Sequence, residues 1–285
     1  MMAGRIAVVG AGTMGCGIAQ AALGTGYEVT LIVHSEKGVN EARERIATGF
    51  EKAIAKGAMT SEKKEECMKR LKISWDIKDV NGAEIIIEAV PEEPNTKKDV
   101  LSSIGRSAGQ NAIIATNTSS ISIAALSPSV GNPGRFLGMH FFNPVPVMKL
   151  VELVRGKETS DAAMDIAKAF ASGMGKVAVE VKDSPGFVSN RILMVFINEA
   201  ITALEEGISG REAIDTIAKL GFNHPMGPLE LADYIGLDVC RDIMESIYEQ
   251  TGDAKFKPAK LLVDMVGMGN LGRKSGKGFY EYKPR

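Results

Sequence analysis

The feature that most constrains the fold is a glycine-rich turn near the start of the chain, in RIAVVGAGTMGCGIAQAALG. An apolar strand precedes the turn and a helix of small residues follows it, which is the context that a G-x-G-x-x-G motif requires. Gly10 permits the tight turn, Gly12 lets a pyrophosphate approach the backbone, and Gly15 allows the helix to pack closely on the strand. Free N–H groups at the helix N-terminus favour phosphate there. The residues predicted to bind a dinucleotide are Gly10, Gly12, Thr13, Met14 and Gly15.

Composition is that of an ordinary enzyme, with 285 residues and a formal net charge of −1. This charge gives no electrostatic reason to expect a nucleic-acid or anionic-membrane partner. Cys16, Cys67 and Cys240 have no paired spacing, which indicates a reducing compartment. The first strand leaves no room for a signal peptide, and no apolar run is long enough to cross a bilayer. We therefore expect a cytoplasmic protein, with organelle targeting removed in processing as the open alternative.

Strands alternate with helices along the first two thirds of the chain, which favours an α/β fold with a Rossmann-like, doubly wound, mostly parallel sheet. The expected strands are 5–10, 28–33, 71–75, 84–88, 112–116, 136–141, 149–154 and 176–181. The expected helices are 14–25, 38–57, 61–69, 95–107 and 160–173. After VKDSPGF the apolar residues have helical spacing throughout. We therefore predict a dinucleotide-binding domain over 1–184 and an all-helical domain over 185–285.

A histidine and a glutamate stand in two successive apolar strands, within GMHFFNPVPVMKLVELVRG. His140 lies at the end of its strand, where ligands gather in an open α/β sheet. Glu152 has apolar neighbours and needs a partner, since a buried carboxylate is costly alone. If the strands pair, Glu152 accepts the imidazole N–H and fixes the tautomer, as a general acid/base requires. We predict that this pair is catalytic.

Polar residues follow another apolar strand in ATNTSS and should reach the same sheet edge. There Asn117 is assigned to the cofactor and Ser119 to the substrate carbonyl. The alternative for Ser119 is an N-cap for a helix beginning at Ile121, for which Ser122 serves as well. Asn190 opens the long helix after the domain boundary, and alone it would be a structural residue.

These stretches together resemble the short-chain 3-hydroxyacyl-CoA dehydrogenases, and most closely the bacterial members that act on 3-hydroxybutyryl-CoA. Blocks such as IIIEAVPEE, ATNTSSISI, DSPGFVSNRIL, NHPMGPLELADYIGLD and GRKSGKGFYEY occur in the family's order over nearly the whole chain. The resemblance implies reversible hydride transfer between NAD(P)H and acetoacetyl-CoA or (S)-3-hydroxybutyryl-CoA. It matches His140 and Glu152 to the catalytic pair, and Ser119 and Asn190 to the residues that orient the substrate.

The resemblance also implies contacts to the rest of the two ligands. Lys52 and Lys56 match positions that contact the CoA tail, although a solvated charged helix face is the alternative. Glu92 and Lys97 are placed near the nicotinamide ribose, with a purely structural role left open. The site would be complete only when the two domains approach each other. No metal site is expected.

One position departs from the family's pattern. An acid usually ends the second strand and binds the adenosine ribose, whereas this chain has Val33 there, followed by His34, Ser35 and Lys37. Loss of the acid removes repulsion against a 2′-phosphate. Against this, Glu36 could bind a ribose and the stretch has no Arg, so the cofactor is NAD or NADP.

The first helix of the helical domain is apolar around nearly its whole girth in ILMVFINEAI, which favours burial against a second copy of the chain. The family's dimerisation through this domain agrees, so a homodimer is expected. Two other classes stay open: a dehydrogenase of a hydroxy acid without CoA, and a non-catalytic relative that binds CoA or a nucleotide.

Overall fold

The structure is a computed structural model that describes residues 4–283, so the outermost ends of the two predicted domains, 1–3 and 284–285, lie outside the described residues. The chain divides into two compact units between Asp183 and Ser184. Each unit has its own apolar core.

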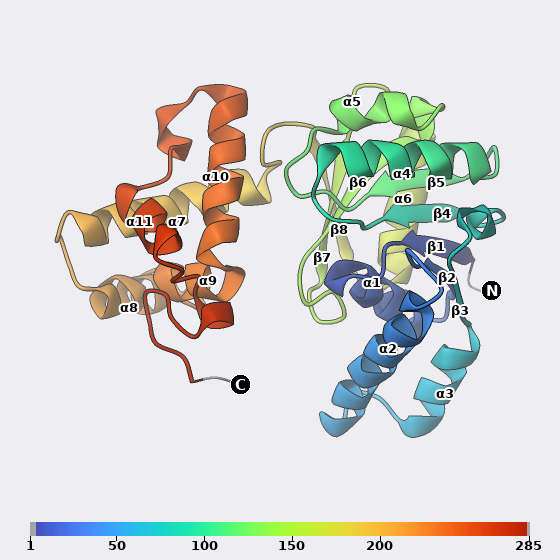
Figure 1. Cartoon of the computed structure of the whole chain (residues 1–285), viewed down its shortest axis with the longest axis horizontal. Coiled ribbons are helices and arrows are strands. Elements are labelled where there is room, and N and C mark those ends of the chain that lie inside the picture. Colours follow the sequence, from blue (N-terminus) through green and yellow to red (C-terminus); the bar gives the residue numbers. More distant parts are fainter. Residues whose placement is uncertain (1–3, 284–285) are drawn as a thin grey trace. The chain divides into compact units, whose positions relative to one another are not determined.

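The first unit is built on one eight-stranded sheet with the order β3-β2-β1-β4-β5-β6-β7-β8 (Figure 1). The strands are β1 (Arg5–Val9), β2 (Glu28–Ile32), β3 (Leu71–Ser74), β4 (Ile85–Glu88), β5 (Ile113–Thr116), β6 (Phe136–Phe141), β7 (Leu150–Arg155) and β8 (Val177–Lys182). The first six are parallel, β7 is antiparallel to β6, and β8 is parallel to β7. The strand order reverses between β1 and β4, which is where ligands bind in doubly wound sheets.

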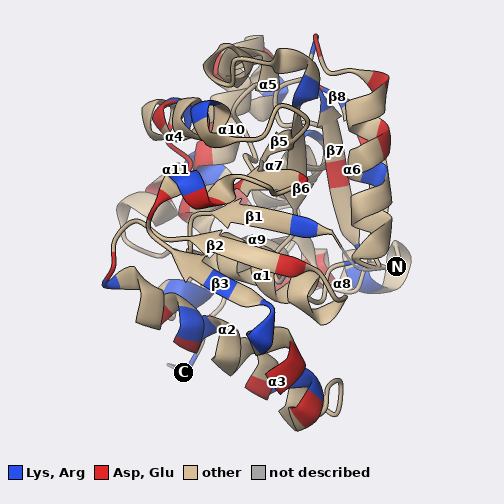
Figure 2. Cartoon of the chain, turned by 90° about the vertical axis from the view of Figure 1, so that its right-hand side faces the viewer, with Lys and Arg blue, Asp and Glu red and all other residues tan. Residues whose placement is uncertain are grey.

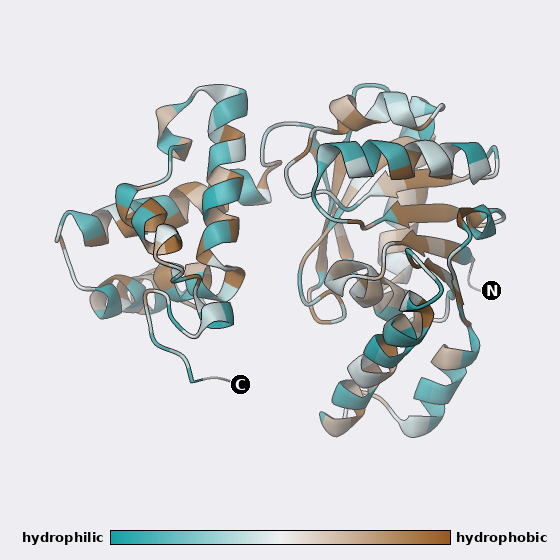
Figure 3. Ribbon diagram, in the orientation of Figure 1, coloured by the Kyte–Doolittle hydropathy of each residue, from teal (hydrophilic) through white to brown (hydrophobic). Residues whose placement is uncertain are grey.

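Helices cover both faces of this sheet (Figure 1). They are α1 (Thr13–Gly24), α2 (Gly38–Ala55), α3 (Ser61–Lys69), α4 (Pro94–Ser107), α5 (Ile123–Leu126) and α6 (Asp161–Gly173). Ile85 and Ile87 of β4 pack in the core with α1, α2 and α6, while the alternate residue Ile86 is fully buried on the opposite face. Burial on both faces explains the continuous apolar runs that predicted these strands, and Figure 3 shows them as apolar ribbons.

The second unit is helical. It contains α7 (Ser189–Glu205), α8 (Arg211–Gly221), α9 (Pro228–Ile235), α10 (Leu237–Thr251) and α11 (Lys260–Gly267). Its core includes Met194, Ile201 and Leu237. The buried Asp233 carboxylate accepts hydrogen bonds of 2.9 Å from the N–H groups of Phe279 and Tyr280, which ties the segment after α11 to α9.

The predicted fold class is confirmed: a Rossmann-like, mostly parallel sheet is followed by an all-helical region. One local expectation is wrong. The short helix after β5 begins at Ile123 rather than Ile121, and the Ser122 side chain caps it by accepting from Ala125 N–H. In the part of the chain that the structure describes, no helix has the length and apolar character needed to span a membrane.

Candidate active site

Four parallel strands bring their carboxyl ends to one edge of the sheet. Val9 is the register partner of Glu88, Glu88 of Thr116, and Thr116 of Gly138. The glycine-rich turn follows β1, residues 117–120 follow β5, and His140 stands two residues beyond Gly138 on β6. Segments that are far apart in the sequence therefore deliver their polar groups to the same edge.

The glycine-rich turn has the shape that a dinucleotide needs. Gly10 has φ +109°, a conformation that side chains disfavour. A Cβ on Gly15 would lie 1.8 Å from the Gly10 carbonyl oxygen, whereas a Cβ on Gly12 would meet nothing within 4 Å. No side chain caps the N-terminus of α1. The open space over Gly12, next to uncapped helix N–H groups, fits the pyrophosphate of NAD or NADP.

His140 and Glu152 form a buried pair across β6 and β7. They are direct partners in the antiparallel register, and His140 Nδ1 lies 2.9 Å from Glu152 Oε2. The two residues are 7% and 2% exposed. Because a carboxylate only accepts, Nδ1 carries the proton of this bond, and Nε2 is the ring nitrogen that can exchange a proton with a ligand. The strand pairing that the sequence suggested is present.

Asn117 and Ser119 follow β5, the strand that pairs with the strand of His140. Asn117 Oδ1 accepts a 2.9 Å hydrogen bond from the N–H of Phe141, the residue after His140. Ser119 N–H donates to Glu92 Oε1 at 2.8 Å, and Ser120 N–H donates to the same oxygen at 3.0 Å. Asn117 thus links the ends of β5 and β6, and Glu92 shapes the turn that carries Ser119.

The environment of Glu92 favours its ionised form. Burial by itself raises the pKa of this carboxyl, but the Lys97 ammonium and hydrogen bonds from Thr118, Ser119 and Ser120 hold the pKa below its ordinary value. Lys97 Nζ lies 3.2 Å from Glu92 Oε2. Glu92 and Lys97 therefore hold this turn together, which is the structural role left open for them in the sequence. Their predicted position near the nicotinamide ribose stays a prediction.

A buried ion pair beneath this turn was missed in the sequence. Glu88, at the end of β4, is fully buried and Lys97 is 1% exposed. Glu88 Oε1 lies 2.9 Å from Lys97 Nζ and accepts from Val90 N–H at 2.7 Å, and its Oε2 accepts from the Thr116 hydroxyl at 2.6 Å. The available signal was an acid ending the apolar run IIIE. The pair joins β4, β5 and α4 at the candidate site.

The residues expected to contact the adenosine ribose and the CoA tail lie on α2 and close to its two ends. Val33 is 4% exposed and belongs to the apolar core, whereas His34 is exposed. Lys52 and Lys56 are exposed on the charged outer side of the helix and just beyond its end; Figure 2 shows charges of both signs on α2 and α3. The exposure of the two lysines suits a phosphate contact and a solvated face equally.

Asn190 belongs to the second unit, where it is the second residue of α7 and is 8% exposed. Its predicted contact with substrate stays a prediction.

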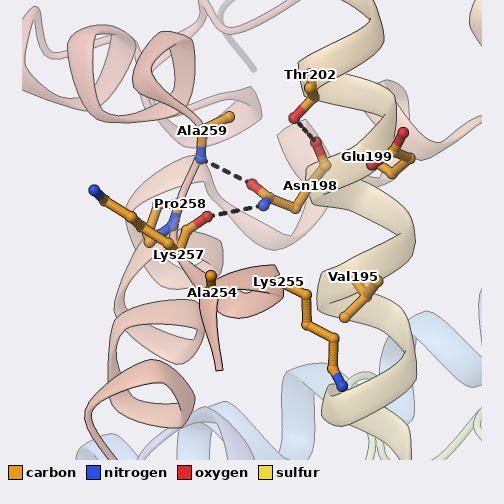
Figure 4. Close-up of a pocket in the computed structure, with 9 residues that line it drawn as sticks. All are labelled: Val195, Asn198, Glu199, Thr202, Ala254, Lys255, Lys257, Pro258 and Ala259. Carbon is orange, nitrogen blue, oxygen red and sulfur yellow. Dashed lines mark hydrogen bonds between the residues drawn. The ribbon is translucent and has the colours of Figure 1, made fainter. Parts of the chain in front are cut away.

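The same unit has a surface pocket of about 330 Å³ between α7 and the segment before α11 (Figure 4). In it the Asn198 amide donates to Lys257 O and accepts from Ala259 N–H, both at 2.9 Å. Those bonds hold the segment in place, so this amide is engaged in structure.

Thiol chemistry has no support at this edge. Cys16, Cys67 and Cys240 are buried, and burial raises the pKa of each, that of Cys240 to about 12. Among residues 4–283, no three His, Cys, Asp or Glu side chains are grouped as a metal site requires. The predicted role of His140 and Glu152 in proton transfer needs neither a thiol nor a metal ion.

Comparison with known proteins shows similarity along nearly the whole chain. The family model described as "3-hydroxyacyl-CoA dehydrogenase, NAD binding domain" matches residues 5–184. The model described as "3-hydroxyacyl-CoA dehydrogenase, C-terminal domain" matches residues 186–282.

Individual relatives are similar over their full length. A probable 3-hydroxybutyryl-CoA dehydrogenase of Deinococcus radiodurans is 45% identical, over 98% of this chain and 100% of the relative. A 3-hydroxybutyryl-CoA dehydrogenase of Bradyrhizobium diazoefficiens is 41% identical, over 98% and 95%. The crystal structure of (S)-3-hydroxybutyryl-CoA dehydrogenase from Ralstonia eutropha superposes with a TM-score of 0.95 at 45% identity, covering 98% of this chain and 99% of that one.

Proposed function

Since the chain belongs to the 3-hydroxyacyl-CoA dehydrogenase family, we propose that it catalyses reversible hydride transfer between NAD(P)H and acetoacetyl-CoA, giving (S)-3-hydroxybutyryl-CoA. The observation that carries the proposal is the His140–Glu152 pair, which stands at the same sheet edge as an intact dinucleotide turn. A relative that only bound CoA or a nucleotide would have no need of a buried imidazole–carboxylate pair. The names of the relatives support the four-carbon substrate.

His140 acts as the general acid and base. During reduction, protonated His140 donates its Nε2 proton to the oxygen on C3 of the substrate. During oxidation, neutral Nε2 accepts the proton of the 3-hydroxyl group. Throughout, the Nδ1–H bond to Glu152 fixes the tautomer and stabilises the imidazolium. When bound, the nicotinamide cofactor would supply the hydride to C3 in reduction or accept it from C3 in oxidation.

The remaining residues bind the substrate. Ser119 orients the 3-oxygen from the turn that Glu92 shapes. Asn190 binds the thioester end of the substrate or the groups between it and the 3-oxygen, as the resemblance implies. Lys52 and Lys56 bind the CoA phosphates, which requires exposed cations, and both side chains are exposed.

The cofactor is a nicotinamide dinucleotide. Gly10, Gly12 and the N–H groups at Thr13 and Met14 would hold its pyrophosphate, and Asn117 would face its nicotinamide end. The family model that matches is an NAD-binding domain. The residues after β2 leave NAD and NADP both possible.

The active form is a homodimer that assembles through the helical unit. Large apolar side chains are exposed there, such as Ile192 at 66%, Leu220 at 82% and Phe222 at 60%. Exposed apolar surface of this kind marks protein interfaces. We place the enzyme in the cytoplasm, because its three cysteines are buried and unpaired.

The test is the initial rate of acetoacetyl-CoA reduction, followed at 340 nm with NADH and NADPH in parallel. Acetoacetate and other free oxo acids at matched concentrations are the control. Turnover of the thioester alone supports the proposal. Equal turnover of a free acid would point to a dehydrogenase that does not require CoA, and binding without turnover would point to a non-catalytic relative.

A further inference from the structure

Helix α2 places a guanidinium at the rim of the glycine-rich turn. Arg45 Nη1 donates a hydrogen bond of 3.2 Å to the carbonyl oxygen of Ala11, between Gly10 and Gly12 of the turn. Arg45 is exposed. A guanidinium has five N–H donors, so one bond to Ala11 leaves donors for an anion at this rim. Residues 33–37, which follow β2, contain no Arg. Helix α2 supplies Arg45, eight residues after Lys37.

The end of β2 offers no carboxylate to compete with this cation. Val33 stands there, and its side chain is buried in the core beside α2, where a Cβ on Gly38 would lie 3.4 Å from Val33 Cβ. The loop that follows is exposed and contains His34, Ser35 and Lys37. In dinucleotide-binding folds an acid at this place binds the ribose 2′-hydroxyl, whereas an arginine accommodates a 2′-phosphate. The absence of the acid and the presence of Arg45 at the adjoining turn favour the second arrangement.

We propose that Arg45 recognises the 2′-phosphate of NADP, so that this chain binds NADP in preference to NAD; the proposal rests on the dehydrogenase function given above. The ligand group is a dianionic phosphate monoester on the adenosine ribose. The planar guanidinium can meet it with two parallel N–H bonds. His34, Ser35 and Lys37 supply further donors from the loop. The one carboxylate in that loop, Glu36, is the group that would favour a ribose hydroxyl instead.

Two small nucleotides isolate the 2′-phosphate without any catalysis. Isothermal titration of the cofactor-free enzyme with adenosine 2′,5′-bisphosphate and with adenosine 5′-monophosphate compares ligands that differ only in that group. We expect the parent enzyme to bind the bisphosphate at least ~10-fold more tightly, the scale of one charge-assisted hydrogen bond. Arg45→Met should remove this difference and leave the affinity for the monophosphate unchanged. Arg45→Lys should keep part of the difference, since the charge stays and the fork is lost.

Arg43→Met is the matched control, because Arg43 is also exposed and lies on the same helix two residues away, so its side chain points to nearly the opposite side. It should leave both affinities unchanged. Thermal unfolding checks that each variant is folded, including the Arg45 variants that lack the bond to Ala11.

Three results would overturn the proposal: no preference for the bisphosphate in the parent enzyme, a preference that survives Arg45→Met, or equal losses for both nucleotides. The last would mean that Arg45 serves the shared 5′-phosphate or only the turn. These outcomes are separate from failure of the proposed function, which would show as no acetoacetyl-CoA reduction with either NADH or NADPH. Reduction with NADH and tighter binding of the monophosphate would keep the function and reject the role of Arg45.

Discussion

His140 and Glu152 face each other across an antiparallel strand pair, with 2.9 Å between His140 Nδ1 and Glu152 Oε2. Strand pairing sets this distance, because direct partners on neighbouring strands have their Cβ atoms about 5 Å apart. The backbone register thus places the two side chains within hydrogen-bonding distance. Because both residues are buried, water does not compete for this hydrogen bond. The His140 imidazole is therefore oriented by the sheet itself rather than by a loop.

Replacement of His140 by Gln tests its role in proton transfer. We expect turnover of acetoacetyl-CoA to fall by ~10²-fold or more, the usual scale for loss of a positioned acid/base. Glu152→Gln should also lower turnover, since a neutral amide cannot stabilise the imidazolium. Stopped-flow and steady-state rates give the effect, and titration with NADH and NADPH controls for cofactor binding. Wild-type turnover in His140→Gln would remove this residue from the mechanism.

The glycine-rich turn yields a prediction that separates folding from binding. Gly12→Ala should fold nearly as well as the parent, because its Cβ would meet nothing within 4 Å, yet lose at least ~10-fold in dinucleotide affinity because that space is reserved for phosphate. Gly15→Ala should lose ~2 kcal/mol or more of unfolding free energy, because its Cβ would lie 1.8 Å from the Gly10 carbonyl oxygen. Urea unfolding and NADPH fluorescence titration measure the two effects. Unchanged affinity in Gly12→Ala would contradict the placement of the pyrophosphate.

The strands and the contact between His140 and Glu152 were predictable because their signals are local. Parallel strands buried on both faces have continuous apolar runs, and an acid inside such a run needs a partner nearby. The partners Glu88–Lys97 and Arg45–Ala11 were not predictable in the same way. Each joins separate elements, and the second spans 34 residues, so only the packing of α4 and α2 against the sheet reveals them. The start of the short helix after β5 was missed by two residues because serines at 119, 120 and 122 are all able to cap.

Substitutions of Glu88 and Lys97 should have strongly non-additive effects on the free energy of unfolding. Lys97→Met leaves the Glu88 carboxylate without its countercharge in a fully buried place, and we expect a loss of ~3–5 kcal/mol of unfolding free energy. Adding Glu88→Gln to Lys97→Met should recover part of that loss, because no uncompensated charge remains. A double-mutant cycle by urea unfolding measures the coupling. Additive effects of the two substitutions would show that the pair does not act as a unit.

Lys52 and Lys56 give a test of CoA recognition. Changing both to Glu should raise the KM for acetoacetyl-CoA and leave the KM for the nicotinamide cofactor unchanged, and added salt should raise the parent's KM in the same way. The control changes Lys157 and Lys182 to Glu, since both are exposed, lie outside α2 and alter the net charge equally. If the two double variants have the same KM for acetoacetyl-CoA, the lysines of α2 form only a solvated face.

Ionisation of Glu92 makes the stability of the turn that carries Ser119 depend on pH. Its folded-state pKa lies below the ordinary value of 4.5, even though burial raises it, because Lys97 and the hydrogen bonds from residues 118–120 favour the carboxylate. A carboxyl whose folded pKa is depressed contributes stability that is fully present above its unfolded pKa and is lost as the pH falls through the folded pKa. The parent should therefore unfold at a higher temperature than Glu92→Gln at pH 7, and the difference should shrink as the pH falls below 4.5. Scanning calorimetry between about pH 7 and pH 3 measures both proteins under the same conditions, so that other carboxyls cancel. A difference in Tm that does not change with pH would mean that the hydrogen bonds to Glu92, and not its charge, hold the turn in place.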